Sequence, residues 1–216
     1  MPHKRPYASP LREQAAARTR EQILLRATEL FAERGYGLVT VADIASAAGV
    51  SPKTVFASTG SKSDILDRIV DQGVAASGYE DAVREVLGQS SPKAVIEALA
   101  RGTRAGNEEH FCVHEAIHKA LPVHENGDAL RRRATAAYRD ALRAGAHHLH
   151  ALTPAPAGTE TETADLLWFW FGPGGWRSLV VENGWSWDRT EEFLVRTATA
   201  TLYEGSYTAR TAGVGQ

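Results

Sequence analysis

TVADIASAAGVSPKTVFASTGSKSDIL, residues 40–66, carries the signals for two short helices and for the start of a third. Thr40 and Asp43 have the spacing of a capping box, which begins a helix. Gly49 ends that helix, because glycine adopts a positive φ with little strain. Ser51 caps the next helix, and the proline after it suits the first helical position, where a backbone N–H has no partner. The stretch therefore predicts a helix, a tight turn and a second helix.

Apolar residues in the same stretch recur at helical spacing. Val41, Ile44, Ala45 and Ala48 form one narrow stripe on the first helix, and Val55 is the inward residue of the second. Helix, glycine-containing turn and helix is the plan of the helix-turn-helix motif. The second helix of that motif enters the major groove of DNA with its N-terminal residues.

A further pattern within the stretch consists of Ser51, Thr54, Val55, an aromatic Phe56, Ser61, Lys62, Ile65 and Leu66. This pattern resembles the DNA-binding signature of the TetR (tetracycline-repressor-like) family of transcriptional regulators. The resemblance implies an all-α fold, with an N-terminal three-helix helix-turn-helix domain and a C-terminal helical bundle for ligand binding and dimerisation. It also implies a repressor that binds a palindromic operator in double-stranded DNA as a homodimer and is released by a small effector.

The sequence departs from the family pattern at three positions. The family usually has Tyr where this chain has Phe56, His or Tyr at Ser58, and Phe at Thr59. Two candidate phosphate contacts are therefore missing, and the plug behind the second helix is smaller. The residues expected to meet DNA are Thr40, Ser51, Pro52, Lys53, Thr54, Phe56, Ser58 and Lys62.

Composition is that of an ordinary soluble globular protein, with 43% hydrophobic and 23% charged residues among 216. A lone Cys112 excludes an intramolecular disulfide and suits a reducing cytoplasm. We expect no signal peptide and no membrane span, because the N-terminus is polar and no apolar run approaches about 20 residues. Residues 1–65 hold nine Lys/Arg against six Asp/Glu, and residues 66–216 hold 15 against 20. A basic front and an acidic remainder fit a DNA-binding head on a body that does not bind DNA.

The expected domains are 17–77 for DNA binding and 78–208 for ligand binding and dimerisation, with flexible tails at 1–16 and 209–216. The first tail carries basic residues among prolines, which is typical either of a plain disordered tail or of an arm that follows DNA. The first helix is expected to begin near Thr19, with a capping box to Gln22.

In the body, no segment alternates with the two-residue period of a strand, and no internal repeat is present. One expected helix begins at Ser61, a second runs from 91 to about 103 or beyond, and the others cover about 107–121, 128–152, 163–182 and 189–205. We expect weak structure around Gly78 and Gly88 and a mobile linker at 153–163. The Gly-Pro-Gly-Gly run at 172–175 should break or kink the helix that contains it.

His114-Glu115-Ala116-Ile117-His118 matches the H-E-x-x-H zinc motif, with His110 one turn earlier. The third-ligand region lacks the glycine and the methionine turn of metzincin proteases, and no strands are expected. We therefore expect no enzyme and no cofactor. A helical metal enzyme and a regulatory metal site at these histidines remain weaker alternatives.

The segment 166–187 holds all five tryptophans and is apolar on every side, so it needs cover from the body and from a second subunit. By resemblance, the dimer interface lies in the last two helices, at about 163–182 and 189–205. Burial as plain core is the alternative, and a charge at Leu167 or Leu194 is expected to give a monomer.

The long helix at 128–152 presents small residues inward, which leaves volume for a ligand. A small hydrophobic or aromatic effector is expected to contact Phe111, His114, His118, Tyr138, Ala141, Trp168 and Phe171. The alternatives are close alanine–aromatic packing without a cavity, and an adaptor whose body binds another protein.

Overall fold

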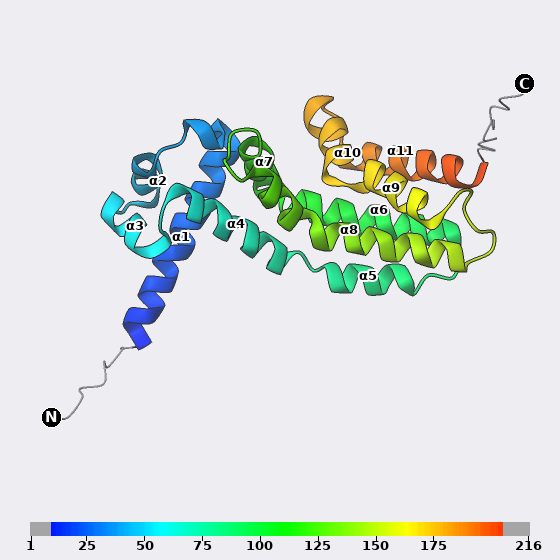
Figure 1. Cartoon of the computed structure of the whole chain (residues 1–216), viewed down its shortest axis with the longest axis horizontal. Coiled ribbons are helices and arrows are strands. Elements are labelled where there is room, and N and C mark those ends of the chain that lie inside the picture. The colour runs from blue at the N-terminus through cyan, green and yellow to red at the C-terminus, as the bar shows by residue number, and fades with distance from the viewer. Residues whose placement is uncertain (1–9, 205–216) are drawn as a thin grey trace, which may run out of the picture. The chain divides into compact units, whose positions relative to one another are not determined.

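The computed structural model describes residues 10–204, and every regular element in that range is helical (Figure 1). The all-α class expected from the sequence is confirmed. Among the helices of this range, none is both long enough and apolar enough to cross a bilayer. The expected tail at 209–216 and most of the basic arm lie outside the described residues.

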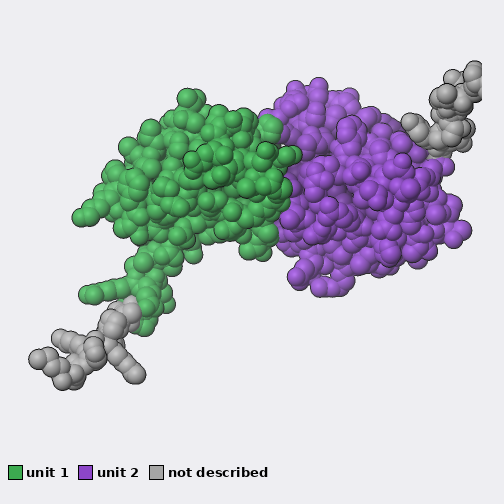
Figure 2. All heavy atoms as spheres, in the orientation of Figure 1, with its two compact units in different colours: residues 1–76, 110–134 green, residues 77–109, 135–216 purple. Residues whose placement is uncertain are grey.

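The chain forms two compact units (Figure 2). Unit 1 comprises residues 1–76 and 110–134, and unit 2 comprises residues 77–109 and 135–216. The first change of unit comes after residue 76, and the body was expected to start at residue 78. Residues 110–134, however, pack with the N-terminal unit. The assignment of DNA binding to 17–77 and of ligand binding and dimerisation to 78–208 stays a prediction.

Unit 1 is built around the helix-turn-helix. Its elements are α1 (Pro10–Arg34), the 3₁₀ turn η1 (Tyr36–Leu38), α2 (Val41–Ala48), α3 (Pro52–Thr59), α4 (Lys62–Ala76), α7 (Phe111–Ala120) and the first turns of α8 (Gly127–Ala151). The Thr40 capping box is present, and Gly49 ends α2 at φ +67°. Ser51 caps α3 by accepting from the Thr54 N–H. The local signals in the sequence therefore set these helix ends.

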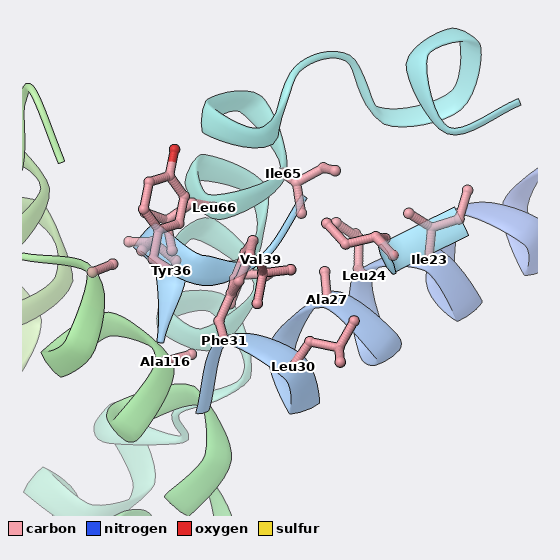
Figure 3. Packing of buried hydrophobic residues seen from close by; sticks show 14 of the residues in the cluster. Ile23, Leu24, Ala27, Leu30, Phe31, Tyr36, Val39, Ile65, Leu66 and Ala116 are labelled. Carbon is pink, nitrogen blue, oxygen red and sulfur yellow. The ribbon is translucent and has the colours of Figure 1, made fainter. Parts of the chain in front are cut away.

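The core of unit 1 joins α1 to the helices that follow it (Figure 3). Ile23 and Phe31 of α1 are fully buried, as are Ile44 of α2, Val55 of α3 and Leu66 of α4. Helix α7 contributes buried alanines to the same core. The three-helix head predicted from the sequence is thus extended by a helix from more than 40 residues further along the chain.

Helix α1 begins earlier than expected. It starts at Pro10, whereas the sequence predicted a start near Thr19 after a flexible segment. The Thr19 hydroxyl donates to the Ala15 carbonyl, an i−4 bond within the helix, so it caps nothing. The Leu-Arg-Glu-Gln-Ala-Ala-Ala run after Pro10 is rich in strong helix formers, which explains the extension without a buried stripe.

Unit 2 is a helical bundle. Its elements are α5 (Tyr79–Leu87), α6 (Pro92–Glu109), the rest of α8, α9 (Glu160–Phe171), α10 (Pro173–Arg177), the π-helical turn η2 (Ser178–Glu182), α11 (Trp187–Thr199) and the π-helical turn η3 (Ala200–Glu204). Leu142 and Leu149 of α8, Leu167 and Phe171 of α9, and Trp176 of α10 are almost completely buried.

Several body boundaries differ from expectation. Residues 79–87 form α5, where weak structure was expected, because the two flanking glycines terminate a helix and do not prevent one. Helix α6 ends at Glu109, in keeping with the expected end at about 103 or beyond, but the helix expected at 107–121 begins only at Phe111, after a break at His110. Helix α9 begins at Glu160, because Thr159 and Glu162 form a capping box inside the expected linker.

The helix break expected at 172–175 is confirmed. Gly172 is extended, with φ −68° and ψ 163°, and Pro173 starts α10 as its first residue. The proline has no N–H to continue the α9 ladder, and it fits the first turn of a new helix.

Candidate nucleic-acid interface and effector site

Helix α3 presents one face away from the core of unit 1. Val55 is fully buried, whereas Lys53 is exposed and Phe56 keeps 55% of its surface accessible. Thr54 and Ser58 are half-buried on the flanks of the same short helix. The N-terminal residues of α3 are therefore available to a ligand as large as DNA.

The three helix starts in this region differ in charge. Asp43 at the start of α2 and Asp64 at the start of α4 accept hydrogen bonds from Thr40 and Ser61, and these bonds lower the pKa of both carboxyls. A carboxylate therefore already occupies the positive end of each helix. At α3 the corresponding residue is Thr54, so this start carries no acid. Of the three, α3 is the start best suited to a phosphate or a base edge.

Lys62, expected to bind DNA, makes bonds inside unit 1. Its ammonium donates to the carbonyls of Tyr36 and Val39, both at 2.9 Å, and lies 4.3 Å from the centre of the Tyr36 ring. Burial lowers the pKa of this ammonium. The side chain ties η1 to the start of α4, which leaves one N–H for any other acceptor.

Two arginines hold the C-terminal end of α3. Arg20 Nε donates to the Ser58 carbonyl at 3.1 Å, and Arg68 Nε donates to the Thr59 carbonyl at 3.3 Å. Cations are favourable at a helix C-terminus, where carbonyls lack partners. Thr59 is buried and donates to the Val55 carbonyl. This smaller side chain thus occupies the position behind α3 where the family usually has Phe. Nothing in the sequence indicated that Arg68 would bond to the end of α3.

Helix α7 is fastened to the head by polar contacts. Lys119 of α7 donates to the Ala32 carbonyl near the end of α1, and His124, in the turn that follows α7, has its Nε2 2.9 Å from the Ser63 hydroxyl on α4. Burial, and secondarily the charge of His110, lowers the pKa of His114 to about 4, so this imidazole is neutral at physiological pH.

The H-E-x-x-H segment lies on α7. Glu115 is buried, His118 is exposed and His114 is half-buried. Within residues 10–204, no three His, Cys, Asp or Glu side chains are grouped closely enough to hold a metal ion. The histidines of this segment therefore lie on a helix that packs against the helix-turn-helix.

Tyr138 is the centre of a buried polar group in unit 2. Its hydroxyl donates to the Phe171 carbonyl and accepts from Asn107 Nδ2 at 3.0 Å. The rings of Tyr79 and Trp168 meet the Tyr138 ring edge-on, at 5.4 and 5.8 Å between centres. Burial raises the pKa of Tyr138, so the hydroxyl keeps its proton and remains a donor. The sequence pointed to three of these five residues and missed Tyr79 and Asn107.

The residues expected to form one effector site belong to different units. Phe111, His114 and His118 lie in unit 1, whereas Tyr138, Ala141, Trp168 and Phe171 lie in unit 2. Of the second group, Trp168 and Phe171 contact Tyr138, through a ring and through a backbone carbonyl. The space beside Gly145 is occupied, because a Cβ there would lie 3.0 Å from Leu99. At that position the volume is filled by a leucine of α6.

The aromatic run of α9 is covered unevenly within the chain. Trp170 and Phe171 are buried and Trp168 is half-buried, but Phe169 keeps 70% of its surface exposed. Leu167 and Leu194, suggested by the sequence as interface positions, are core residues with 0% and 3% exposure. A charge at either would disrupt unit 2 itself, so neither position can test dimerisation.

The fold and the exposed α3 define a helix-turn-helix protein with a separate helical body. Residues 23–69 match the family profile described as bacterial regulatory proteins, tetR family. Residues 23–69 of this chain are therefore similar to the DNA-binding domain of the TetR family.

Known proteins resemble different parts of the chain. It is 28% identical over 106 residues to the HTH-type transcriptional repressor BdcR of Escherichia coli (strain K12), which is 47% of this chain and 54% of that protein. The match thus spans about half the length of that relative. The structure of the transcriptional regulator FadR from Bacillus subtilis in complex with stearoyl-CoA has a TM-score of 0.67 at 13% identity, covering 85% of this chain and 99% of that one. A regulator-like chain from Saccharomonospora viridis in complex with choline has a TM-score of 0.65 at 20% identity, covering 86% and 98%. Both likenesses concern the fold.

Proposed function

We propose that this protein is a sequence-specific transcriptional repressor that binds a palindromic operator as a homodimer and releases it when a small effector binds. The observation that carries the proposal is α3, which exposes Lys53 and Phe56 and starts without an acid. The family, and a relative named a transcriptional repressor, support the same role. A cytoplasmic location goes with that role.

DNA is read mainly by the first turns of α3 in this proposal. Lys53 and Thr54 face the base edges, and Ser51, Pro52, Phe56 and Ser58 flank them. Thr40 and Lys62 contribute less, because their side chains are already bonded within unit 1. Selection from random DNA should recover a palindrome whose half-sites are separated by about 34 Å or a multiple of it. Failure to enrich any sequence would contradict the proposal.

A charge-matched pair of variants tests the role of α3. Lys53→Ala should weaken operator binding and alter the preferred base at one position of each half-site. Lys93→Ala removes the same charge from an exposed position on α6 and should leave binding unchanged. Equal effects of the two changes on binding, measured by fluorescence anisotropy, would place the DNA contact elsewhere.

The dimer interface is proposed to lie on α9, η2 and α11, where Phe169 and Val181 are exposed apolar residues. Phe169→Glu should give a folded monomer with reduced operator affinity, because a buried unpaired carboxylate is costly in an interface. Leu87→Glu alters an exposed leucine on α5 and should leave the dimer intact. Light scattering decides the question, and a wild-type monomer at micromolar concentration would refute this assignment.

The effector is proposed to be a small hydrophobic or aromatic molecule bound in unit 2 beside Tyr79 and Trp168. Both rings are half-buried, and the Arg139 guanidinium lies 3.8 Å from the Trp168 ring centre. An apolar site with a few polar groups is the usual make-up of a small-molecule site. Phe111, His114 and His118 lie in unit 1, so the proposal no longer depends on them.

A matched pair of tryptophans tests the effector site. Hydrophobic metabolites are screened for release of the operator, and a hit is repeated with Trp168→Ala and Trp185→Ala. Trp185 also carries a stacked arginine, with Arg189 at 3.7 Å from its ring centre, but it does not adjoin Tyr138. Only Trp168→Ala should abolish release. A hit that acts equally on both variants would place the site elsewhere.

A further inference from the structure

The reading head, defined here as residues 23–65, carries no net charge. It holds four Lys/Arg and four Asp/Glu, whereas residues 1–22 hold five Lys/Arg and two Asp/Glu. All of the positive excess of the first 65 residues therefore precedes Ile23, the first buried residue of α1. Because affinity for DNA depends strongly on cations that replace phosphate counterions, a neutral reading head requires cations from another segment.

The basic residues inside the reading head are largely engaged. Arg26 forms an ion pair with Glu29 at 2.8 Å, and Lys62 bonds to two backbone carbonyls. Arg34 lies near the Asp43 carboxylate, whose pKa it helps to lower. Lys53 is the basic residue that projects from α3. One such cation per subunit is few for a protein that must hold a polyanion.

The first turns of α1 project beyond the reading head (Figure 1). Residues 10–22 are exposed, apart from a half-buried Thr19, and none of them belongs to the core. Thirteen helical residues span about 20 Å, which is the length of about six base pairs. Arg20 joins this projection to α3 through its bond to the Ser58 carbonyl. The projection is therefore continuous with the surface that α3 presents.

The projection has two differently directed sets of arginines. Arg12, Ala16, Arg20 and Leu24 follow one another at intervals of four residues, and each such step turns about 40° around an α-helix. Arg20 lies about 40° from the buried Leu24 and bonds to the Ser58 carbonyl of α3, and Arg12 lies about 80° from Arg20. Arg18 lies about 160° from Arg20, so it is on the side of the helix away from α3, and Arg12 is nearer to the α3 side than Arg18 is. Glu13, next to Arg12, offsets part of the positive charge.

We propose that residues 10–22 of α1 form a second DNA-binding element, which contacts the phosphate backbone beside the half-site that α3 reads. Arg12 and Arg20 supply the phosphate contacts. The occupant is double-stranded DNA, because the face is basic and continues the α3 surface. This inference rests on the proposed function, and it assigns a role to a segment that precedes the family match at 23–69.

The test measures operator affinity of the full chain against salt concentration, for the wild type, Arg12→Ala, Arg18→Ala and Glu13→Gln. In a dimer, Arg12→Ala removes two phosphate contacts and should flatten the slope of log affinity against log salt by about 1.8. Between 50 and 200 mM salt, this variant should lose about tenfold less affinity than the wild type. Arg18→Ala should keep the wild-type slope, and Glu13→Gln should bind more tightly.

A second readout varies the DNA. Fragments that end at the outer edge of the half-sites are compared with fragments that carry ten more base pairs on each side. The wild type should bind the longer fragment more tightly, and Arg12→Ala should show a smaller gain.

The two proposals fail differently. Operator binding that depends on Lys53, but responds equally to Arg12→Ala and Arg18→Ala or to neither, overturns this inference alone. A wild-type protein that selects no operator overturns the proposed function and this inference with it. Retained helicity in circular dichroism shows that each variant is folded.

Discussion

Tyr138→Phe and Tyr203→Phe remove hydroxyls from two tyrosines of unit 2 in opposite settings. The Tyr138 hydroxyl is buried, donates to the Phe171 carbonyl and accepts from Asn107 Nδ2. The Tyr203 hydroxyl is also shielded from solvent but has no hydrogen-bond partner among residues 10–204. Burial raises the pKa of Tyr203 to about 12, and it raises the pKa of Tyr138 as well, so both hydroxyls are protonated in neutral solution.

The expected change in stability follows from the partners that each substitution leaves behind. Tyr138→Phe leaves a buried carbonyl and a buried amide N–H unpaired, at about 1–3 kcal/mol each, so we expect a loss of about 2–6 kcal/mol. Tyr203→Phe removes a polar group that was already unpaired, so the stability of unit 2 should stay the same or rise by about 1 kcal/mol. Each variant lacks one oxygen atom of the wild type and keeps the aromatic ring. Ring packing therefore does not contribute to the difference in stability between the two variants.

Tryptophan fluorescence during urea unfolding measures this difference in unit 2 alone, because all five tryptophans lie in that unit. With slopes of about 1–3 kcal/mol per molar urea, the unfolding midpoints of the two variants should differ by about 1 M or more. Asn107→Ala combined with Tyr138→Phe should cost less than the sum of the single changes, because the two groups are bonded to each other. Equal midpoints for the two tyrosine variants would refute the assigned hydrogen bonds.

Three further predictions concern unit 1 and the packing of α8. The pKa of His114 is about 4 in the folded protein and about 6.5 in the unfolded chain, so the unfolded chain takes up a proton first as the pH falls. The free energy of unfolding should therefore drop by roughly 3 kcal/mol between pH 6.5 and pH 4. Acid titration of His114→Leu should show less of this loss than titration of His118→Leu. Lys62→Ala should lower the thermal stability of unit 1 by about 1–3 kcal/mol, because it removes two internal hydrogen bonds, and Lys53→Ala should not. Equal melting temperatures for the two variants would contradict the internal bonds of Lys62. Gly145→Ala should destabilise unit 2 by about 1–3 kcal/mol in urea unfolding, because the new Cβ would lie 3.0 Å from a leucine of α6. An unchanged unfolding midpoint would mean that this leucine moves freely.

Local signals explain why the helix-turn-helix could be predicted. The capping box at Thr40, the glycine at 49 and the cap at Ser51 each act within four residues, so their effect is the same before and after the chain folds. The break at Gly172 and Pro173 is predictable for the same reason. The start of α1 was misjudged because a run of good helix formers needs no buried stripe to be helical.

The candidate DNA-binding residues could be found by type but not by availability. Lys62 and Lys53 are both lysines at helix starts, and no local signal separates them. The ammonium of Lys62 bonds to carbonyls 23 and 26 residues earlier, and such bonds exist only when η1 and α4 are packed together. The sequence therefore determined which groups could touch DNA, and the packing decided which of them are already engaged.

The body shows the same division more strongly. Its helices, their apolar faces and the concentration of aromatic residues in 166–187 follow from the order of residues alone. The grouping of α7 with the head, the filling of the space at Gly145 by Leu99 and the partners of the Tyr138 hydroxyl depend on segments 31 to 46 residues apart or more. Helical periodicity tells which side of a helix is buried, because the repeat is a property of one helix. It cannot tell which other helix covers that side, because many apolar faces are interchangeable until shape and volume are matched in three dimensions.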